Sequence, residues 1–540
     1  MTPAEEPADP DRARRVDRGV TRTLVAGTAT KYALLTASIG TGIFLMPFTV
    51  RHLGKPQYGL WMLVASLTSY FSLLDLGYGN GLVRHIVAAD TRGDVRRVNE
   101  IASTFVCIYA VIGLAACLVT GGLVLLVVPH FPNLTSAEVS TARIVLALMG
   151  FRIAVGFPMT VFGAVTNARH GFVLNNSIAL VMVIVNALLT YVVLAAGGGL
   201  VMLVAVTTAA SLTGYIGYAW SAHRVFPALS LRVRHFSRDQ WREVTSFSVY
   251  LFIIDMASQV TFNLDNVVVG AFLGTSAVAV YAVAVRLSEY QRRVCDQFSG
   301  MLYTVAVGFG TGGRVDRLRN VLIEGTRLAV VLVVGVTICL VGFIGPLISR
   351  WMGPGFGGSV PAFVVLSIVG IVMVGHATQQ SILLATGRHR TVTAIWIVEA
   401  AANLALSLIL VRRFGALGVA AGTAIPIAVG HLLVMTPTAA RSVGLPLWRY
   451  ARETLLPALI GGVPAAALCI FIRLTFATPS LGRIALGASL VGAVYLAVVA
   501  TFGLDRSTRR LYLAHLSGAA SAVRDMSVRR VAGPHIAAAK

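Results

Sequence analysis

The chain has 540 residues, of which 56% are hydrophobic and only 12% are charged, and its mean hydropathy is +0.79. Because soluble domains carry roughly 25% charged residues, this composition excludes an ordinary soluble protein and indicates an integral membrane protein. The formal net charge of +22 could suggest a nucleic-acid partner, but the basic residues gather in alternate loops between apolar segments, which indicates membrane topology and no nucleic-acid binding.

The first thirty residues are polar and carry charges of both signs. They lack the apolar core of a cleaved signal, so the first apolar segment is expected to be a retained anchor. Segments of about 20 apolar residues, enough to cross a bilayer as helices, then follow one another. The sequence predicts an all-α membrane protein with about 14 transmembrane helices. They lie near 31–50, 58–83, 101–128, 141–165, 172–196, 200–222, 244–272, 277–308, 321–348, 359–385, 391–411, 416–436, 454–476 and 482–503.

The chain repeats itself along these spans. The Leu-Gly pair that ends at Gly54 recurs at Gly274, an offset of 220 residues (274 − 54). The charged turn TRGDVRRVN, which ends at Asn99, recurs as TGGRVDRLRN, which ends at Asn320, an offset of 221 (320 − 99). Further landmarks at similar offsets are Arg169-His170 with Arg388-His389, and Asn186 with Asn403. Repeats of this size in a hydrophobic chain are typical of secondary transporters.

A copy of six helices keeps its orientation when it is repeated. The duplication therefore predicts two six-helix lobes related by a pseudo-two-fold axis along the membrane normal, around a shared cavity, plus two C-terminal helices. The excess of Lys and Arg in alternate loops places both termini in the cytoplasm. The expected parts are a polar tail (1–30), an N-lobe (31–222), a basic linker (223–243), a C-lobe (244–436), the last two helices (454–503) and a basic tail (504–540).

Two motifs carry a resemblance to a known family. The run FTVRHLGKPQYGLW, with LLDLGYGNGLVR and the charged turn after it, resembles the polysaccharide-synthesis flippases, O-antigen-type repeat-unit translocases of the multidrug/oligosaccharidyl-lipid/polysaccharide exporter superfamily. In the second half, Asp265, Gly274, Tyr281 and Arg286 occupy the places of the family's pattern of Asp, Leu-Gly, Tyr and a basic residue. The resemblance covers about residues 24–503.

The resemblance implies a flippase rather than an enzyme. Such a protein translocates a lipid-linked oligosaccharide of the undecaprenyl-pyrophosphate type across the cytoplasmic membrane by alternating access, for cell-surface polysaccharide biosynthesis. The expected partners are this substrate, membrane lipids, and a polysaccharide polymerase and glycosyltransferases. A peptidoglycan-precursor flippase or a multidrug or cation exporter of the same superfamily stays open as an alternative.

Two enzymatic classes are disfavoured by the sequence. The lysines are Lys31, Lys55 and Lys540, and none lies in the Gly-Lys-Ser/Thr context of a phosphate-binding loop, which excludes an ATP-driven pump. A membrane glycosyltransferase, polymerase or ligase usually has a substantial external loop, whereas the external loops here are short, as in GPGFGGS. Neither a disulfide framework nor a metal site is expected, because the 5 cysteines fall within apolar spans without paired spacing.

Charged residues within the spans are the candidate site residues, because a charge at the bilayer centre costs about 2.5–3.5 kcal/mol unless it faces a cavity or a partner. The span 277–308 has the most, with Arg286, Glu289, Arg293 and Asp296 on one helical stripe. Guanidinium groups suit phosphate, so the arginines are expected to contact the pyrophosphate. The alternative is pairing of Arg286 with Glu289 and of Arg293 with Asp296. The candidate substrate-binding residues are Arg84, Arg152, Arg286 and Arg293.

Carboxylates within the spans are candidates for ion coupling. Asp255, Asp265 and Glu399 could bind a coupling ion, H+ or Na+, and no other cofactor is expected. The alternative is that each is a structural partner of an arginine. His376 and His431 are expected to be packing residues rather than a proton relay.

The first and second copies differ in charge. The span 58–83 is followed by Arg84 and contains Asp75, which is expected to cap a break in that helix. The corresponding span 277–308 has five charged residues. We therefore expect the second lobe to bind much of the charge of the substrate.

Overall fold

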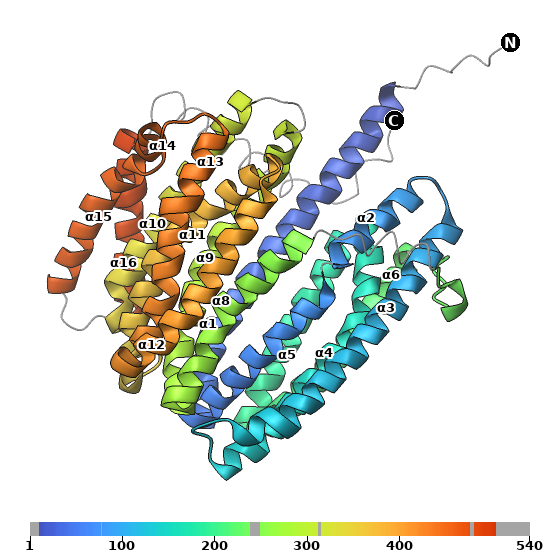
Figure 1. The fold of residues 1–540 in the computed structure, drawn as a ribbon, viewed down its shortest axis with the longest axis horizontal. Helices are drawn as coiled ribbons and strands as arrows, with labels where there is room; N and C mark the ends of the chain where they lie inside the picture. Colours follow the sequence, from blue (N-terminus) through green and yellow to red (C-terminus); the bar gives the residue numbers. More distant parts are fainter. Residues whose placement is uncertain (1–9, 77, 238–248, 311–314, 476–479, 504–540) are drawn as a thin grey trace, which may run out of the picture. The chain divides into compact units, whose positions relative to one another are not determined.

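The computed structural model describes residues 10–76, 78–237, 249–310, 315–475 and 480–503, which form helices and turns without a strand (Figure 1). The first half comprises α1 (Pro10–Ser69), the 3-10 helix η1 (Tyr70–Asp75), α2 (Tyr78–Asp90), α3 (Val95–Gly122), α4 (Ser136–Ala168), α5 (Phe172–Ala195) and α6 (Leu200–Val225). The second half comprises α8 (Val249–Leu273), α9 (Thr275–Gly310), α10 (Val315–Trp351), α11 (Ser359–Ala385), α12 (His389–Val429), α13 (Thr436–Ser442), α14 (Leu447–Thr454), α15 (Leu456–Thr475) and α16 (Leu481–Val498).

The apolar helices confirm an all-α, multi-pass membrane protein. Within the described residues, 10 helical segments are long and apolar enough to cross a membrane. Two of them, Ala26–Asp75 with 50 residues and His389–Ser442 with 54, each cover two of the predicted spans. The helices α8 and α9 lie at two further predicted spans. The ten segments together with α8 and α9 therefore correspond to the fourteen predicted spans.

Both long segments contain a glycine at which the helix is interrupted. Gly54 in α1 has φ 76° and ψ 165°, and Gly415 in α12 has φ 57° and ψ −139°. In α12 the two halves fold back on each other, because Asn403 Nδ2 donates to Thr423 Oγ1 at 2.8 Å and Ser407 Oγ to the Val419 carbonyl at 3.5 Å. The segment is thus a hairpin of two spans with its turn at Gly415.

The left-handed turns follow the sequence repeat. Gly54 (φ 76°) and Gly274 (φ 81°) stand at the offset of 220, and Gly197 (φ 80°) and Gly415 (φ 57°) at an offset of 218 (415 − 197). Glycine adopts positive φ without the steric cost that a Cβ brings. The duplication therefore preserves turn geometry as well as sequence. The second copy of the charged turn includes residues 311–314, which lie outside the described residues.

A side chain at the α12 turn should be strained. Gly415→Ala places a Cβ at φ 57° and ψ −139°, a conformation that is almost confined to glycine and costs about 1–3 kcal/mol for other residues. We expect a lower unfolding temperature for purified Gly415→Ala, measured by intrinsic fluorescence. The control is Gly121→Ala in α3, where an added Cβ meets no atom within 4 Å. Equal unfolding temperatures for the two variants would contradict a strained turn.

The predicted break in the second span is confirmed. The 3-10 helix η1 ends at Asp75, Leu76 is left-handed with φ 49°, and α2 begins at Tyr78. The Asp75 carboxylate accepts the backbone N–H of Gly79 at 3.4 Å and the Tyr109 hydroxyl of α3 at 2.6 Å. It therefore caps the start of α2 and ties the break to α3.

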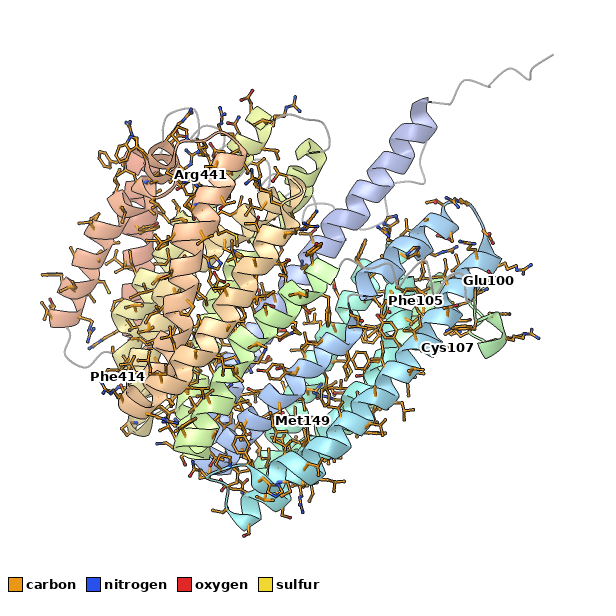
Figure 2. All side chains as sticks on the ribbon, viewed as in Figure 1. Glu100, Phe105, Cys107, Met149, Phe414 and Arg441 are labelled. Carbon is orange, nitrogen blue, oxygen red and sulfur yellow. The ribbon has the colours of Figure 1, made fainter. Side chains whose placement is uncertain are left out.

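The chain divides into two compact units. The first unit comprises Met1–Tyr290, Trp351–Leu366 and Arg388–Gly430, and the second unit comprises Gln291–Arg350, Ser367–Gly387 and His431–Lys540. In the first unit α3 and α4 lie side by side (Figure 1), and an added Cβ on Gly113 would lie 2.5 Å from the Ala154 carbonyl oxygen. Small residues allow such close helix packing in membranes. Phe105 and Met149, marked in Figure 2, are buried.

Candidate functional site

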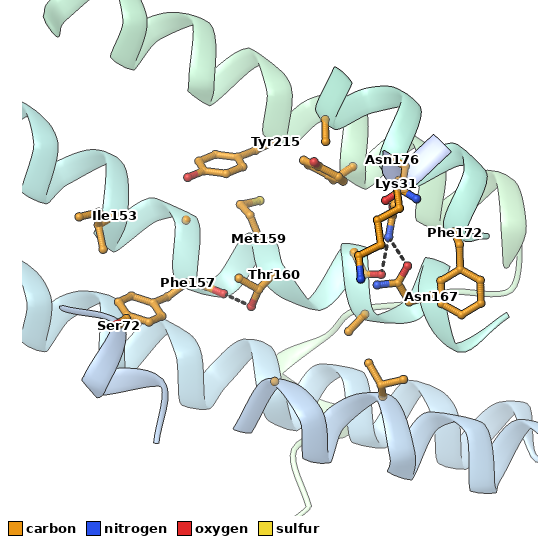
Figure 3. A pocket seen from close by; sticks show the side chains of 18 of the residues that line it. Lys31, Ser72, Ile153, Phe157, Met159, Thr160, Asn167, Phe172, Asn176 and Tyr215 are labelled. Carbon is orange, nitrogen blue, oxygen red and sulfur yellow. Dashed lines mark hydrogen bonds between the residues drawn. The ribbon is translucent and has the colours of Figure 1, made fainter. Parts of the chain in front are cut away.

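The first unit contains a cavity of about 1010 Å³ between helices of the first half. Its walls come from α1, η1, α2, α4, α5 and α6, so that residues far apart in the sequence meet in it (Figure 3). The lining residues are Gly27, Thr28, Lys31, Thr68, Ser69, Ser72, Gly79, Val83, Ile153, Gly156, Phe157, Met159, Thr160, Gly163, Ala164, Asn167, Phe172, Asn175, Asn176, Ala179, Tyr215 and Tyr218.

The surface of this cavity is mostly apolar, and neutral polar side chains and aromatic rings are interspersed among small and aliphatic residues. Of the residues that line the cavity, Lys31 alone carries a charge, and none is a carboxylate. Figure 3 shows Lys31 beside Asn176 and Asn167, with Tyr215 and Ile153 farther along the cavity. The cavity therefore offers a limited number of hydrogen-bonding groups on an apolar surface, with no negative charge among its lining residues.

Hydrogen bonds hold the asparagines of the lining. Asn175 Nδ2 donates to Asn167 Oδ1 and to the Gly163 carbonyl, both at 2.8 Å, and so links α5 to α4. Asn176 Nδ2 donates to Thr30 Oγ1 and to the Gly27 carbonyl, both at 3.1 Å, and so links α5 to α1. Asn176 thus fixes the junction of α1 with α5, and Lys31, which is exposed, follows Thr30 on α1.

Two of the predicted arginines flank the cavity without being among its lining residues. Arg152 on α4 is partly buried, and its backbone carbonyl accepts the Tyr215 hydroxyl at 3.3 Å, whose ring lines the cavity. Arg84 on α2 is exposed, while its neighbour Val83 lines the cavity. Their role in substrate binding stays a prediction.

The other two arginines lie on α9 in different units. Arg286 Nη1 lies 3.0 Å from Glu289 Oε2, which is the pairing across one helical turn that the sequence left as the alternative. Arg293 is exposed and belongs to the second unit. The side chain of Asp296, its expected partner, lies outside the described residues.

The candidate coupling residue Asp265 is at the centre of a buried polar cluster. Its side chain is only 4% exposed, and it accepts the Tyr281 hydroxyl at 2.6 Å. Thr423 Oγ1 lies 2.9 Å from both carboxylate oxygens and itself accepts Asn403 Nδ2 at 2.8 Å. Asn403 Oδ1 is buried and has no hydrogen-bond partner among the described residues. The cluster joins α8, α9 and both halves of the α12 hairpin with no arginine in these contacts.

The other two carboxylates differ from Asp265 in their surroundings. Glu399 is 2% exposed and lies on α12 one turn before Asn403, and an added Cβ on Gly430 would lie 2.0 Å from its Oε1. It is therefore packed on the backbone near the end of the hairpin. Asp255 is exposed on α8, which contacts η1. Asp255 and Asp265 lie ten residues apart on α8 and do not share contacts in the cluster.

Sequence reasoning did not single out the cavity residues. Lys31 could have been found, because it is one of only three lysines and lies in an apolar span. Asn167, Asn175 and Tyr215 carried no such signal. In the second unit, His376 and His431 are both buried and their ring centroids are 4.1 Å apart, a pairing that a separation of 55 residues (431 − 376) does not reveal.

Among the described residues, no three His, Cys, Asp or Glu side chains gather as a metal centre would require. The oxygen cluster around Asp265 is the arrangement that could hold a monovalent cation or a proton, since carboxylate, hydroxyl and amide oxygens suit hard cations. The cavity could hold an uncharged or anionic organic ligand.

Comparison with known proteins gives matches over most of the chain. Residues 27–292 match the family described as "Polysaccharide biosynthesis protein". The chain is 20% identical over 442 residues to the uncharacterized membrane protein EpsK of Bacillus subtilis, which covers 79% of this chain and 84% of EpsK. It is 25% identical over 175 residues to the probable flippase AglR of Haloferax volcanii, covering 32% of this chain and 37% of AglR.

Solved structures share the fold. Lipid II flippase MurJ in an inward closed conformation aligns with a TM-score of 0.66 over 88% of this chain and 98% of MurJ, at 14% identity. An inward-facing multidrug resistance MATE family transporter of the MOP superfamily aligns with a TM-score of 0.66 over 76% of this chain and 94% of its own, at 13% identity.

Proposed function

Because residues 27–292 belong to the polysaccharide biosynthesis protein family and the chain has the fold of the multidrug/oligosaccharidyl-lipid/polysaccharide exporter superfamily, we propose that the protein is a flippase for a lipid-linked oligosaccharide. It would carry a substrate of the undecaprenyl-pyrophosphate type across the cytoplasmic membrane by alternating access, with both termini in the cytoplasm. The proposed cycle needs no covalent step. Its product would supply cell-surface polysaccharide synthesis, in which a polymerase and glycosyltransferases are the expected partners.

The lining of the cavity in the first unit is the observation that carries this proposal. Amide and hydroxyl side chains such as Asn167 and Thr160 can exchange hydrogen bonds with sugar hydroxyls, which would otherwise cost several kcal/mol each to desolvate. The rings of Phe157 and Tyr215 offer flat apolar surfaces to the faces of sugar rings. A volume of about 1010 Å³ is at the upper end of the range for ligand sites, which is roughly 300–1,000 Å³.

Lys31 supplies the one positive charge that an anionic phosphate requires. A lysine ammonium binds phosphate as a point charge, and such charge-assisted hydrogen bonds are among the stronger ones in proteins. The absence of a carboxylate from the lining disfavours the alternative of a cation exporter, because a cationic substrate needs a negatively charged group in its binding site. A peptidoglycan-precursor flippase has the same requirement for a phosphate and sugars, so substrate competition distinguishes these two.

The Asp265 cluster supports ion coupling. The carboxylate and the Tyr281 and Thr423 hydroxyls form an oxygen-rich site between α8, α9 and α12, and the Asn403 amide nitrogen donates to Thr423 beside it. We propose that this site binds the coupling ion, H+ or Na+, during the transport cycle. Transporters of this general design place such ions near the midplane on residues of neighbouring helices.

Lys31→Ala should weaken substrate binding by about 10–100-fold, because a hydrogen bond to a charged group contributes about 1.5–3 kcal/mol. The measurement is binding of a fluorescent lipid-linked oligosaccharide to the purified protein in nanodiscs, with restoration of surface polysaccharide in a flippase-deficient host as a second readout. Lys31→Arg is the matched control and should retain binding. Unchanged affinity in Lys31→Ala would remove the cavity from the proposed substrate path.

Surface polysaccharide should also be lost in Arg152→Ala and Arg286→Ala if these arginines contact the substrate.

A further inference from the structure

A second cavity lies outside the proposed transport site, where the linker after α6 folds along the start of α3. In Figure 1 this linker is the short green segment beside α3, and Figure 2 marks Glu100 at that end of α3. Asn99 holds the linker at two points, because its Nδ2 donates to the Ala228 carbonyl at 3.0 Å and its Oδ1 accepts the Ser230 N–H at 2.8 Å. Asn99 thus both donates a hydrogen bond to the linker backbone and accepts one from it.

Further contacts fix the rest of the linker. Ser103 Oγ accepts the Arg232 N–H at 3.2 Å, and Thr104 Oγ1 accepts the Ser237 N–H at 3.1 Å. At the start of the linker, Phe226 is buried beneath the guanidinium of Arg169, which lies 4.3 Å from its ring centroid. The linker from 226 to 237 therefore forms a wall along α3, because polar side chains of α3 hydrogen-bond to its backbone at successive points.

The wall and α3 line a half-open polar pocket of about 730 Å³, with Arg234 and Phe236 exposed at its edge. Its lining residues are Arg96, Asn99, Glu100, Arg234, His235, Phe236 and Ser237. The only acidic group among them, Glu100, lies 2.9 Å from Arg96 Nε, so that pairing with one arginine offsets its charge. The His235 ring is oriented by Nδ1, which lies 3.3 Å from the Ser230 carbonyl. Arg234 and His235 supply cationic or hydrogen-bonding groups on the same wall, and Ser237 lies beside them.

We propose that this cavity between α3 and the linker binds a phosphate group. Guanidinium forks match the geometry of phosphate oxygens, and a serine hydroxyl and an imidazole add donors for a tetrahedral anion. The site shares no lining residue with the cavity that contains Lys31 and Asn176, and the proposal does not depend on the transported substrate. Phe236, 43% exposed at the rim, would suit a phosphate that is joined to a lipid chain, whereas a soluble phosphate compound needs no apolar contact.

The test uses the full chain in detergent and two probes, inorganic phosphate and dioctanoyl phosphatidylglycerol, titrated at low ionic strength and followed by calorimetry. We expect saturable binding of at least one probe, and about a 10-fold loss of affinity in Arg234→Ala, in line with one hydrogen bond to a charged group. Dioctanoyl phosphatidylcholine tests whether the net charge of the headgroup is needed. Binding of phosphatidylglycerol alone assigns the phosphate to a lipid headgroup, and binding of both probes assigns it to phosphate in general.

Two further variants separate a built site from general basic charge. Arg224→Ala is the matched control, because Arg224 lies in the last turn of α6 next to the linker, stacks on Trp220, 5.3 Å from its ring centroid, and does not line the pocket. It should bind the probes as the unaltered protein does. Asn99→Ala removes no charge but releases the wall, and should weaken binding as Arg234→Ala does. No saturable binding of either probe, or an equal loss in Arg224→Ala and Arg234→Ala, would overturn the proposal.

Discussion

Asp265→Asn should reduce ion-driven transport by about 100-fold while the protein remains folded in the membrane. Asparagine has the shape of aspartate but cannot carry the negative charge that a proton or a sodium ion neutralises. The Tyr281 and Thr423 hydroxyls both point at this side chain, so an amide NH2 in place of one oxygen also loses an acceptor for one of them. Loss of one such charge-assisted contact contributes up to about 3 kcal/mol, which corresponds to about 100-fold in rate.

The measurement is uptake of a fluorescent lipid-linked oligosaccharide into proteoliposomes under an imposed proton or sodium gradient. Asp255→Asn is the comparison variant, since Asp255 is exposed on the same helix and lies outside the buried cluster, and an equal loss in both variants would extend the coupling role to Asp255. Tyr281→Phe keeps the carboxylate and removes one donor, and should shift the ion concentration needed for half-maximal transport rather than abolish transport. Gradient-driven transport that persists in Asp265→Asn would assign the carboxylate a structural role.

Gly59→Ala should both destabilise the protein and abolish transport. A Cβ on Gly59 would lie 1.8 Å from the Thr275 carbonyl oxygen and 2.6 Å from its carbonyl carbon, so backbone rather than a flexible side chain must move. The start of α9 would be displaced, and with it the hydrogen bond from Thr275 Oγ1 to Glu138 Oε1 at 2.7 Å. Forcing a methyl group into a packed site typically costs about 1–3 kcal/mol, which outweighs the roughly 1 kcal/mol that alanine gains over glycine within a helix.

Thermal unfolding of the purified variant and the proteoliposome assay report the two effects. Gly40→Ala is the control, because Gly40 lies in the same long helix α1 and an added Cβ there meets no atom within 4 Å. That variant should be as stable as the unaltered protein or slightly more stable. A Gly59→Ala protein with normal unfolding temperature and normal transport would show that α1 and α9 do not need this close approach.

The sequence predicts the helices and their turns well because hydropathy and glycine act locally. The Leu-Gly landmarks coincide with the left-handed residues Gly54 and Gly274, and Asp75 stands at the predicted break. The sequence does not predict which face of each helix is buried, because lipid-facing residues are as apolar as buried ones. In α3, Leu114 and Leu118 are exposed whereas Phe105 is buried, although all three are apolar. Hydropathy alone therefore could not place the cavity or its asparagines.

The partners of charged residues are likewise predictable from the sequence only when the two residues are close together in the chain. Arg286 and Glu289 lie three residues apart, so the sequence predicts their pairing as one of two interpretations of the helical stripe. Asp265 and Thr423 are 158 residues apart, and only the packing of α8 along α12 brings them together. The first copy, which carried fewer charges in its spans, forms the large cavity, and Lys31 supplies the charge in its lining. The expectation that the second lobe binds much of the charge of the substrate stays a prediction.

The buried cluster also sets an order of events during biosynthesis of the chain. Tyr281 follows Asp265 by 16 residues and belongs to the next helix, so this hydrogen bond can form soon after both have left the ribosome. Thr423 follows 158 residues later, which corresponds to about 10–30 s of synthesis at roughly 5–20 residues per second. For that interval the aspartate has only one of its two hydroxyl partners. The second hydroxyl partner of Asp265 thus comes from the α12 hairpin, in which Asn403 donates to Thr423.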